Sequence, residues 1–335
     1  MTVKMSGNST SNLDSTSPRV RALIRILLLV IALGTPLAIA REYLMPFANA
    51  GVRAFPDANT YLAAGERLNA GHELYRREPG DREVLFEDQF PAAILSPSPI
   101  AVLWRPLAAL SWGFDAWVAA SWVALLGTIA YLVLKIGLPA VLLTLVLSIA
   151  IGQQLAIANV TAFFPAVLVL AWRFRYNPWV GVGIGMISAI KLTPIAMTGW
   201  MIGGRLCWML AVTIGTIGVA GVIGGLGAGF DSYLEYLRIA PQIKPSPDSI
   251  AGLTGISWAS YAVLGGGIVI AVLLGHRWPR WSFAVAVVAS TIGTPVIYPI
   301  GLVPLLALAA PLLPEPAAEP TYGSLNPRAP ERPTR

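Results

Sequence analysis

Long apolar runs, separated by short turns, occupy most of this 335-residue chain. Hydrophobic residues make up 56% of the sequence and charged residues only 12%, which is about half the share found in soluble domains. Runs of this length can cross a lipid bilayer, where only helices and closed barrels satisfy every backbone hydrogen bond. A barrel needs short strands of alternating polarity, and the runs here are continuous. We therefore predict an all-α polytopic membrane protein.

The apolar runs predict about ten helical segments, and we expect about 9–11 transmembrane helices. Several runs are shorter than the roughly 20 residues that an average bilayer requires, so some of them are expected to be half-helices. The predicted segments are residues 20–40, 113–134, 138–151, 155–172, 179–190, 193–203, 206–229, 256–275, 281–297 and 299–314.

Basic residues between the runs predict the orientation of the helices. Lys135, Arg173, Arg205 and Arg277 lie in short turns, and such residues concentrate on the cytoplasmic side of membrane proteins. All of them fall on that side if the proline-containing segment 91–110 is interfacial or re-entrant. We prefer this topology, because a full crossing by 91–110 places Lys135 and Arg173 outside.

The polar segments divide the chain into three parts. Residues 1–18 are rich in Ser, Thr and Asn, and we expect a disordered cytoplasmic N-terminus there. Residues 315–335 are expected to form a Pro-rich disordered cytoplasmic tail. The transmembrane domain covers residues 19–314, with outer loops at 41–112 and 230–255. In the first of these loops, apolar residues at helical spacing predict a short amphipathic helix on the membrane surface.

Asp57 lies in the polar loop that follows the first predicted span, and it is the candidate catalytic residue. An acid at the mouth of a membrane span is costly unless it binds or reacts there. As a general base, Asp57 takes a proton from an acceptor hydroxyl within hydrogen-bond reach. The alternative is that Asp57 is the N-cap of the surface helix, since Asp is among the best capping residues. The two roles are compatible, and both stay open.

Lys191 interrupts an apolar run and is followed by Pro194, which predicts a break in the helix. The ammonium group either binds a phosphate as a point charge or snorkels to the membrane boundary. Gln153 and Asn159 place amides between two apolar helices. These amides either bind sugar hydroxyls and polar head groups or pair the helices with each other.

Other kinds of chemistry have little support in the sequence. The single cysteine, Cys207, and the separated histidines His72 and His276 do not form a metal-binding pattern. The acidic residues in 83–88 lack the spacing of a metal site, and no phosphate-binding glycine motif occurs in a suitable context. The basic residues are scattered, which is typical of orientation signals rather than of nucleic-acid binding. We expect no metal, no cofactor and no nucleic acid.

Several short motifs occur together in an order that resembles a known family. Each motif is weak alone, but their order over residues 20–314 resembles glycosyltransferase family 87, the DUF2029 group of the GT-C class. The motifs are Asp57-x3-Tyr61-x2-Ala64-x6-Gly71-x3-Tyr75, the stretch SPIAVLWRPL at 98–107, Gly152-Gln153, and Gly181-x-Gly183-x7-Lys191-x2-Pro194 with Arg205 beyond it.

The resemblance implies a GT-C-like fold and a hexosyltransferase-type enzyme. The implied reaction moves a mannose-like hexose or a pentose from a polyprenyl-phosphate donor to a lipid or glycan acceptor. It is expected on the extracytoplasmic face of the plasma or inner membrane, without a metal. Asp57 is implied as the general base and Lys191 as a contact to the donor phosphate. The other candidate substrate-binding residues are Tyr61, Gln153, Asn159, Arg105 and Tyr298.

Two other functions stay open at this point. A lipid or solute transporter is expected to show internal repeats with matching broken helices, and no such repeat is evident in the sequence. An inactive scaffold of the GT-C class keeps the fold without its chemistry, and the presence of Asp57 argues against it.

Overall fold

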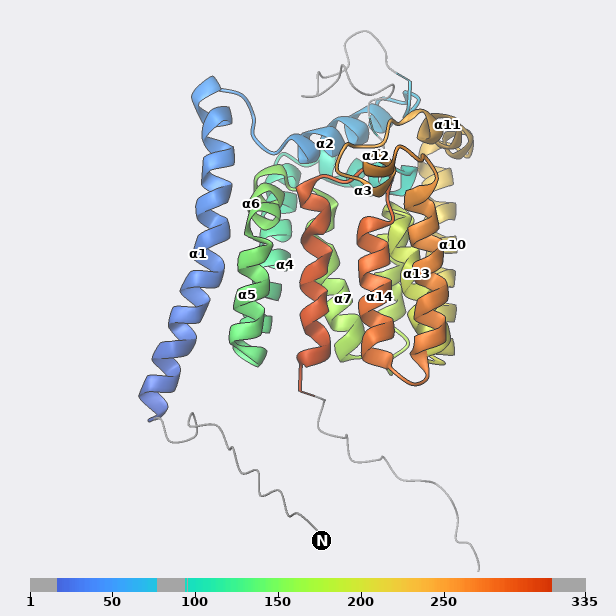
Figure 1. The fold of residues 1–335 in the computed structure, drawn as a ribbon. Helices are drawn as coiled ribbons and strands as arrows, with labels where there is room; N and C mark the ends of the chain where they lie inside the picture. Colours follow the sequence, from blue (N-terminus) through green and yellow to red (C-terminus); the bar gives the residue numbers. More distant parts are fainter. Residues whose placement is uncertain (1–16, 77–93, 95, 315–335) are drawn as a thin grey trace, which may run out of the picture.

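The computed structural model describes residues 17–76, 94 and 96–314. Within these ranges the regular elements are all helices, and most of them run between the two ends of one bundle (Figure 1). The chain is an all-α polytopic membrane protein, as the sequence predicts. The acidic residues in 83–88 and both predicted terminal tails lie outside the described residues, apart from residues 17 and 18.

Four short helices lie at one end of the bundle, which we call the roof (Figure 1). One of them is the surface helix predicted in the first loop. Another covers part of the segment 91–110 and has 11 residues, or about 16 Å at 1.5 Å per residue, which is too short to cross a bilayer. The described part of 91–110 thus holds no helix of full-span length, and the preferred topology stays a prediction. The roof helices are α2 (Pro56–Asn69), α3 (Ser98–Ala108), α11 (Asp231–Ile239) and α12 (Ile250–Thr254).

Among the described residues, three helices are each long and apolar enough to cross a membrane: α1 (Pro18–Ala50), α4 (Gly113–Ile136) and α10 (Cys207–Ala228). A fourth span is possible if α5 (Leu138–Val146) and α6 (Ser148–Ile157), which are bent by 67° against each other, count as one. The other apolar runs in the described part of the chain form shorter helices, and the expected number of 9–11 transmembrane helices stays a prediction. These helices are α7 (Phe164–Arg173), α8 (Val180–Ile190), α9 (Met197–Gly203), α13 (Ala259–Gly275), α14 (Pro279–Ile292) and the 3-10 helix η5 (Pro299–Leu312).

The ends of several predicted segments differ from the structure for local reasons. We expected the first helix to end near residue 40, but it continues to Ala50 and ends at Gly51, whose left-handed φ of 65° caps it. Charged side chains do not stop a helix at the membrane surface, whereas a left-handed residue does. The predicted segment 155–172 is interrupted in the same way, because Ala158 has a φ of 56°.

The basic turns gather at the end of the bundle opposite the roof. The α7–α8 and α13–α14 connections lie at this end (Figure 1); Arg173 is the last residue of α7, and Arg277 lies between α13 and α14. Lys135 lies in the last turn of α4, and Arg205 lies between α9 and α10. This arrangement agrees with the predicted one-sided distribution of positive charge.

Exposed tryptophans occur near both ends of the bundle. Trp112 and Trp258 precede α4 and α13 on the roof side, and Trp179, Trp208 and Trp278 accompany the basic turns. Aromatic belts of this kind lie at the two lipid–water interfaces of membrane proteins. Between them, large apolar side chains stay exposed on α1 and α10, as expected for a surface that faces lipid: Leu23, Ile26, Val30, Ile214, Val219 and Val222.

Helices α8 and α10 approach each other closely through glycines. A Cβ atom on Gly181 would lie 2.4 Å from the carbonyl oxygen of Met209, and one on Gly185 would lie 2.6 Å from Cβ of Thr216. This order of contacts means that the two helices run parallel. Because α8 has 11 residues and α10 has 22, α8 ends partway along α10, with Lys191 as its C-cap.

Gly185→Ala is expected to destabilise the protein by about 1–3 kcal/mol, because the new methyl group overlaps Thr216 and the backbone of α10. Gly215→Ala is the matched control, since a Cβ there meets nothing within 4 Å. Thermal unfolding of the two purified variants in detergent measures the difference. Equal melting temperatures would contradict the close packing of α8 on α10.

Candidate active site

Asp57 lies in the first turn of the roof helix α2. The N-cap of this helix is Phe55, which has a left-handed φ of 64° and provides no side-chain cap. The alternative that Asp57 is the N-cap is therefore wrong. The turn is held instead by Asn59, whose Nδ2 donates to the carbonyl oxygen of Ala54 at 2.9 Å. The carboxylate of Asp57 is left to face another part of the chain, with the favourable end of the helix dipole beside it.

The Asp57 carboxylate contacts the turn between α6 and the short 3-10 helix η2 (Val160–Phe163). Asn159, the N-cap of η2, donates from Nδ2 to Oδ2 of Asp57 at 2.5 Å. The two residues are 102 positions apart in sequence. The fold thus brings a roof helix and a break in the bundle together at this carboxylate.

Lys191 brings a positive charge to the same place. It ends α8 with an extended backbone (φ −132°, ψ 120°), and its charge interacts with Asp57. In the described part of the chain, no direct ion pair joins Lys191 to an acid. Both Lys191 and Asp57 are only partly buried.

Burial raises the pKa of Asp57 above its ordinary value, and the hydrogen bond from Asn159 and the charge of Lys191 lower it only in part. Burial, and then the charge of Asp57, also raise the pKa of Tyr61 well above its usual value. The phenol of Tyr61 therefore stays protonated, and Asp57 remains the candidate base at this site. A carboxylate with a raised pKa suits general base catalysis, which is most efficient when the pKa is near the working pH.

An aromatic cluster supports α2 from below. The ring of Tyr61 lies 6.1 Å from that of Trp104 and 6.0 Å from that of Trp117, measured between centroids. Trp117 also lies 5.1 Å from Phe163 of η2. These rings come from α2, α3, α4 and η2, and they are buried or partly buried. The cluster fixes the roof helix against the elements that carry the rest of the site.

Arg105, a candidate substrate-binding residue, takes part in a different set of contacts. Its guanidinium group donates to the carbonyl oxygen of Gly227 at 3.0 Å and to Oδ1 of Asn69 at 3.1 Å. Asn69 returns a hydrogen bond to the backbone of Arg105 at 2.8 Å. Arg105 thereby joins α3 to α2 and α10, and its role toward a substrate stays a prediction.

For Gln153 and Tyr298, the described residues show no hydrogen bond to Asp57. Gln153 donates from Nε2 to the hydroxyl of Tyr43 on α1 at 2.6 Å. Tyr298 precedes η5 and is 46% exposed. The structure thus brings together Asp57, Tyr61, Asn159 and Lys191 from the predicted set, and the substrate roles of Gln153 and Tyr298 stay predictions.

Two polar residues next to this cluster were not among the predicted site residues. Thr161 Oγ1 lies 2.8 Å from Oε1 of Gln154 and 2.9 Å from Oδ1 of Asn159. Gln154 and Thr161 are fully buried. Polar side chains at 154, 159 and 161 in an apolar stretch are costly unless they bond to one another. That clustering was the available signal in the sequence.

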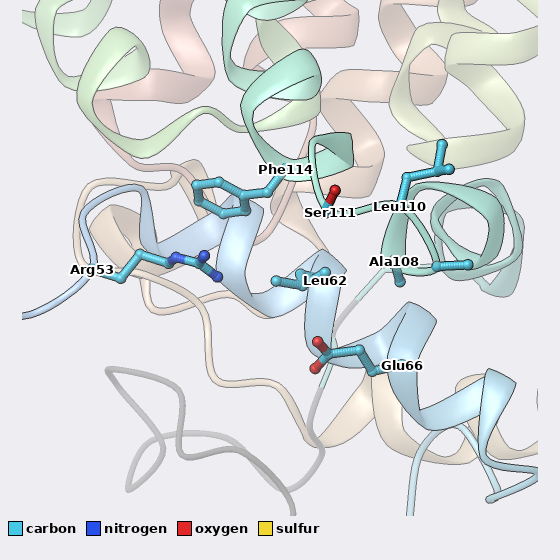
Figure 2. A pocket seen from close by; sticks show the side chains of 8 residues that line it. Arg53, Leu62, Glu66, Ala108, Leu110, Ser111 and Phe114 are labelled. Carbon is cyan, nitrogen blue, oxygen red and sulfur yellow. The ribbon is translucent and has the colours of Figure 1, made fainter.

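A hollow of about 350 Å³ lies beside another part of α2. Figure 2 shows the Arg53 side chain beside Phe114, with the guanidinium carbon 4.4 Å from the ring centroid. The lining includes none of Asp57, Asn159 and Lys191, so the hollow is separate from the carboxylate. Its lining residues are Arg53, Leu62, Glu66, Ala108, Ala109, Leu110, Ser111 and Phe114.

Within the described ranges, no three His, Cys, Asp or Glu residues gather where they could hold a metal ion. Asp57 has Asn159 and Lys191 as its polar neighbours rather than further acids. The expectation of a reaction without a metal stays a prediction.

Comparison with known proteins identifies the family. No curated protein and no solved structure matches the chain. The family model of glycosyltransferase family 87 matches residues 95–303, which is more than half of the sequence. The matched range contains Asn159 and Lys191, whereas Asp57 precedes it. The chain, a multi-pass membrane protein in which the charges of Asp57 and Lys191 interact, therefore belongs to glycosyltransferase family 87.

Proposed function

We propose that this membrane glycosyltransferase moves a mannose-like hexose or a pentose from a polyprenyl-phosphate donor to a hydroxyl group of a lipid or glycan acceptor. One observation carries the proposal: the fold places Asp57 and Lys191, which come from distant parts of the chain, close enough for their charges to interact. A base and a cation at one site are what transfer from a sugar phosphate requires.

The proposed reaction is a single inverting displacement. Asp57 accepts the proton of the acceptor hydroxyl. The oxygen then forms a bond to the anomeric carbon, and the bond between that carbon and the phosphate oxygen breaks. The electron pair of the broken bond leaves with the polyprenyl phosphate.

Lys191 is the residue proposed to stabilise the leaving group. The departing phosphate gains negative charge in the transition state, and a fixed cation in a site with little water stabilises that charge strongly. The leaving group is already an anion, so it needs a positive charge more than it needs a general acid. A protonated lysine serves as such a point charge.

The proposed orientation places the roof on the extracytoplasmic side of the plasma or inner membrane. Basic turns mark the cytoplasmic side in membrane proteins, and here they lie opposite the roof (Figure 1). In this orientation, a donor with a polyprenyl tail keeps its tail in the bilayer and presents its phosphate near the level of the roof.

The direct test is transfer of labelled sugar by the purified protein in lipid vesicles. Polyprenyl-phosphate mannose, glucose and arabinose are offered separately, with extracted membrane lipids and glycans as acceptors. We expect label to move from at least one donor to an acceptor with inversion at the anomeric carbon. Movement of intact donor across the vesicle without transfer would overturn the proposal and favour a transporter.

A further inference from the structure

The side-chain amide of Asn159 is held in one orientation. Its oxygen accepts a hydrogen bond from the backbone N–H of Thr161 at 2.9 Å, and the Thr161 hydroxyl lies at the same distance. Because the donors of Thr161 face the amide oxygen, the NH₂ group of Asn159 must point the other way, toward Oδ2 of Asp57. A flipped amide would place oxygen against carboxylate and NH₂ against N–H.

Gln154 holds the same turn from the opposite direction. Its Nε2 donates to the backbone carbonyl oxygen of Asn159 at 2.6 Å, and its Oε1 lies 2.8 Å from the Thr161 hydroxyl. These three residues, which we call the amide relay, are all buried, with Asn159 the most exposed at 7%. Each has its polar atoms used within the relay or on Asp57.

The backbone under the amide relay is also fixed. Ala158 has a left-handed φ of 56°, a strained conformation for a residue with a Cβ atom, and it is fully buried. Two tryptophans of α4 hold this turn: Trp117 donates to the carbonyl oxygen of Ala158 at 2.9 Å, and Trp122 donates to that of Leu155 at 2.8 Å. Strain of this kind persists only where the surroundings determine the backbone, and it is common at active sites.

We infer that the amide relay of Gln154, Asn159 and Thr161 positions Asp57 for proton transfer, by fixing a hydrogen-bond donor on Oδ2 and leaving Oδ1 to accept the proton. The inference rests on the proposed role of Asp57 as the base. In the described residues, Oδ1 has no hydrogen-bond partner within the protein. The three relay residues are positioning residues, because they act on the substrate only through the carboxylate.

A hydrogen bond to the charged form favours that form, so loss of the donor on Oδ2 is expected to raise the pKa of Asp57 further. The other titratable groups that act on Asp57 are Lys191 and Tyr61. Arg105 on α3 and Asp115 on α4 are charged residues of elements packed against α2, and neither contributes to the shift of Asp57. α6 presents amides rather than charges to this side.

Two substitutions separate the hydrogen bond that Asn159 donates to Asp57 from the structural role of the amide relay. Asn159→Ser keeps a side chain that can cap η2 by accepting from Thr161, but serine is too short to reach Asp57. Thr161→Val keeps the shape and removes the hydroxyl. Thr144→Val is the matched control: this buried threonine of α5 bonds only to the carbonyl oxygen of Ala140 in its own helix.

The first readout titrates Asp57 itself and does not depend on transferase activity. Dicyclohexylcarbodiimide adds to protonated carboxyl groups in apolar surroundings, and mass spectrometry of the Asp57 peptide follows labelling against pH. We expect the midpoint to rise by about one to two pH units in Asn159→Ser, because a hydrogen bond to a charged group contributes about 1.5–3 kcal/mol and one pH unit corresponds to 1.36 kcal/mol. A smaller rise is expected in Thr161→Val and none in Thr144→Val.

The second readout is the pH dependence of transfer. In Asn159→Ser, the acidic limb of the pH–rate profile is expected to move to higher pH by the same amount as the labelling midpoint. As a result, kcat falls at neutral pH and recovers as the pH is raised, with KM little changed. An unchanged labelling midpoint in Asn159→Ser would overturn the inference, whatever happens to activity. If the wild type transfers no sugar, the proposed function fails while the labelling midpoints still decide whether the relay acts on Asp57.

Discussion

Asp57→Asn is expected to reduce the rate of sugar transfer by about 10²–10⁴-fold, because general base catalysis contributes a factor of this size. Asparagine keeps the shape of aspartate but cannot accept a proton from the acceptor hydroxyl. The loss is expected in kcat, with KM little changed, since the carboxylate acts in the proton-transfer step rather than in substrate binding. Transfer from the donor that the wild type uses, measured with purified protein in lipid, gives both constants.

The control for this substitution is Asp115→Asn, which changes an exposed acid in the first turn of α4. Asp57→Asn is not expected to destabilise the fold at neutral pH. Burial raises the pKa of Asp57. At a pH above that pKa, the charged carboxylate therefore lowers the stability of the folded state. This loss of stability disappears as the pH falls through the pKa. Full transfer activity in Asp57→Asn would show that another group is the base, although family membership would stand.

The sequence was sufficient for the fold class and for the gathering of basic turns at one end of the bundle. Apolar runs must become helices in lipid because their backbone groups have no water to bond to, and the turns with Lys135, Arg173, Arg205 and Arg277 marked one end of the bundle. The helix ends were harder to predict. Gly51 and Ala158 stop helices through a left-handed backbone, and an alanine in that conformation carries no signal in a single sequence.

The candidate site was predicted in part. Asp57 and Lys191 stood out because charges are costly next to apolar segments, and the structure brings them together. Arg105 was a candidate only through the family resemblance, and its contacts are with Gly227 and Asn69. Which charge meets which partner depends on contacts between residues far apart in the chain, and hydropathy contains no information about such pairs.

Lys191→Met is expected to lower transfer by about 10²–10³-fold, the size of effect seen when one stabilising group is removed from a developing anion. Methionine keeps the length and the apolar stem of lysine and removes only the charge. Lys191→Arg is expected to restore part of the rate, because the charge returns in a different shape. Lys135→Met, which removes an exposed lysine at the opposite end of the bundle, is the control and is expected to transfer at the wild-type rate.

Product inhibition separates a phosphate contact from a lysine that only marks the membrane boundary. Free polyprenyl phosphate carries the leaving group, so it is expected to inhibit Lys191→Met more weakly than the wild type, whereas neutral polyprenol is expected to inhibit both equally. If Lys191 only snorkels to the membrane boundary, its head group lies in water, and replacing it is expected to leave inhibition by both compounds unchanged. Loss of Lys191 also removes a charge that lowers the pKa of Asp57. The rates must therefore be compared at pH values above the acidic limb of the pH–rate profile. A rate that recovers fully at high pH would mean that Lys191 acts through Asp57 alone and not on the phosphate.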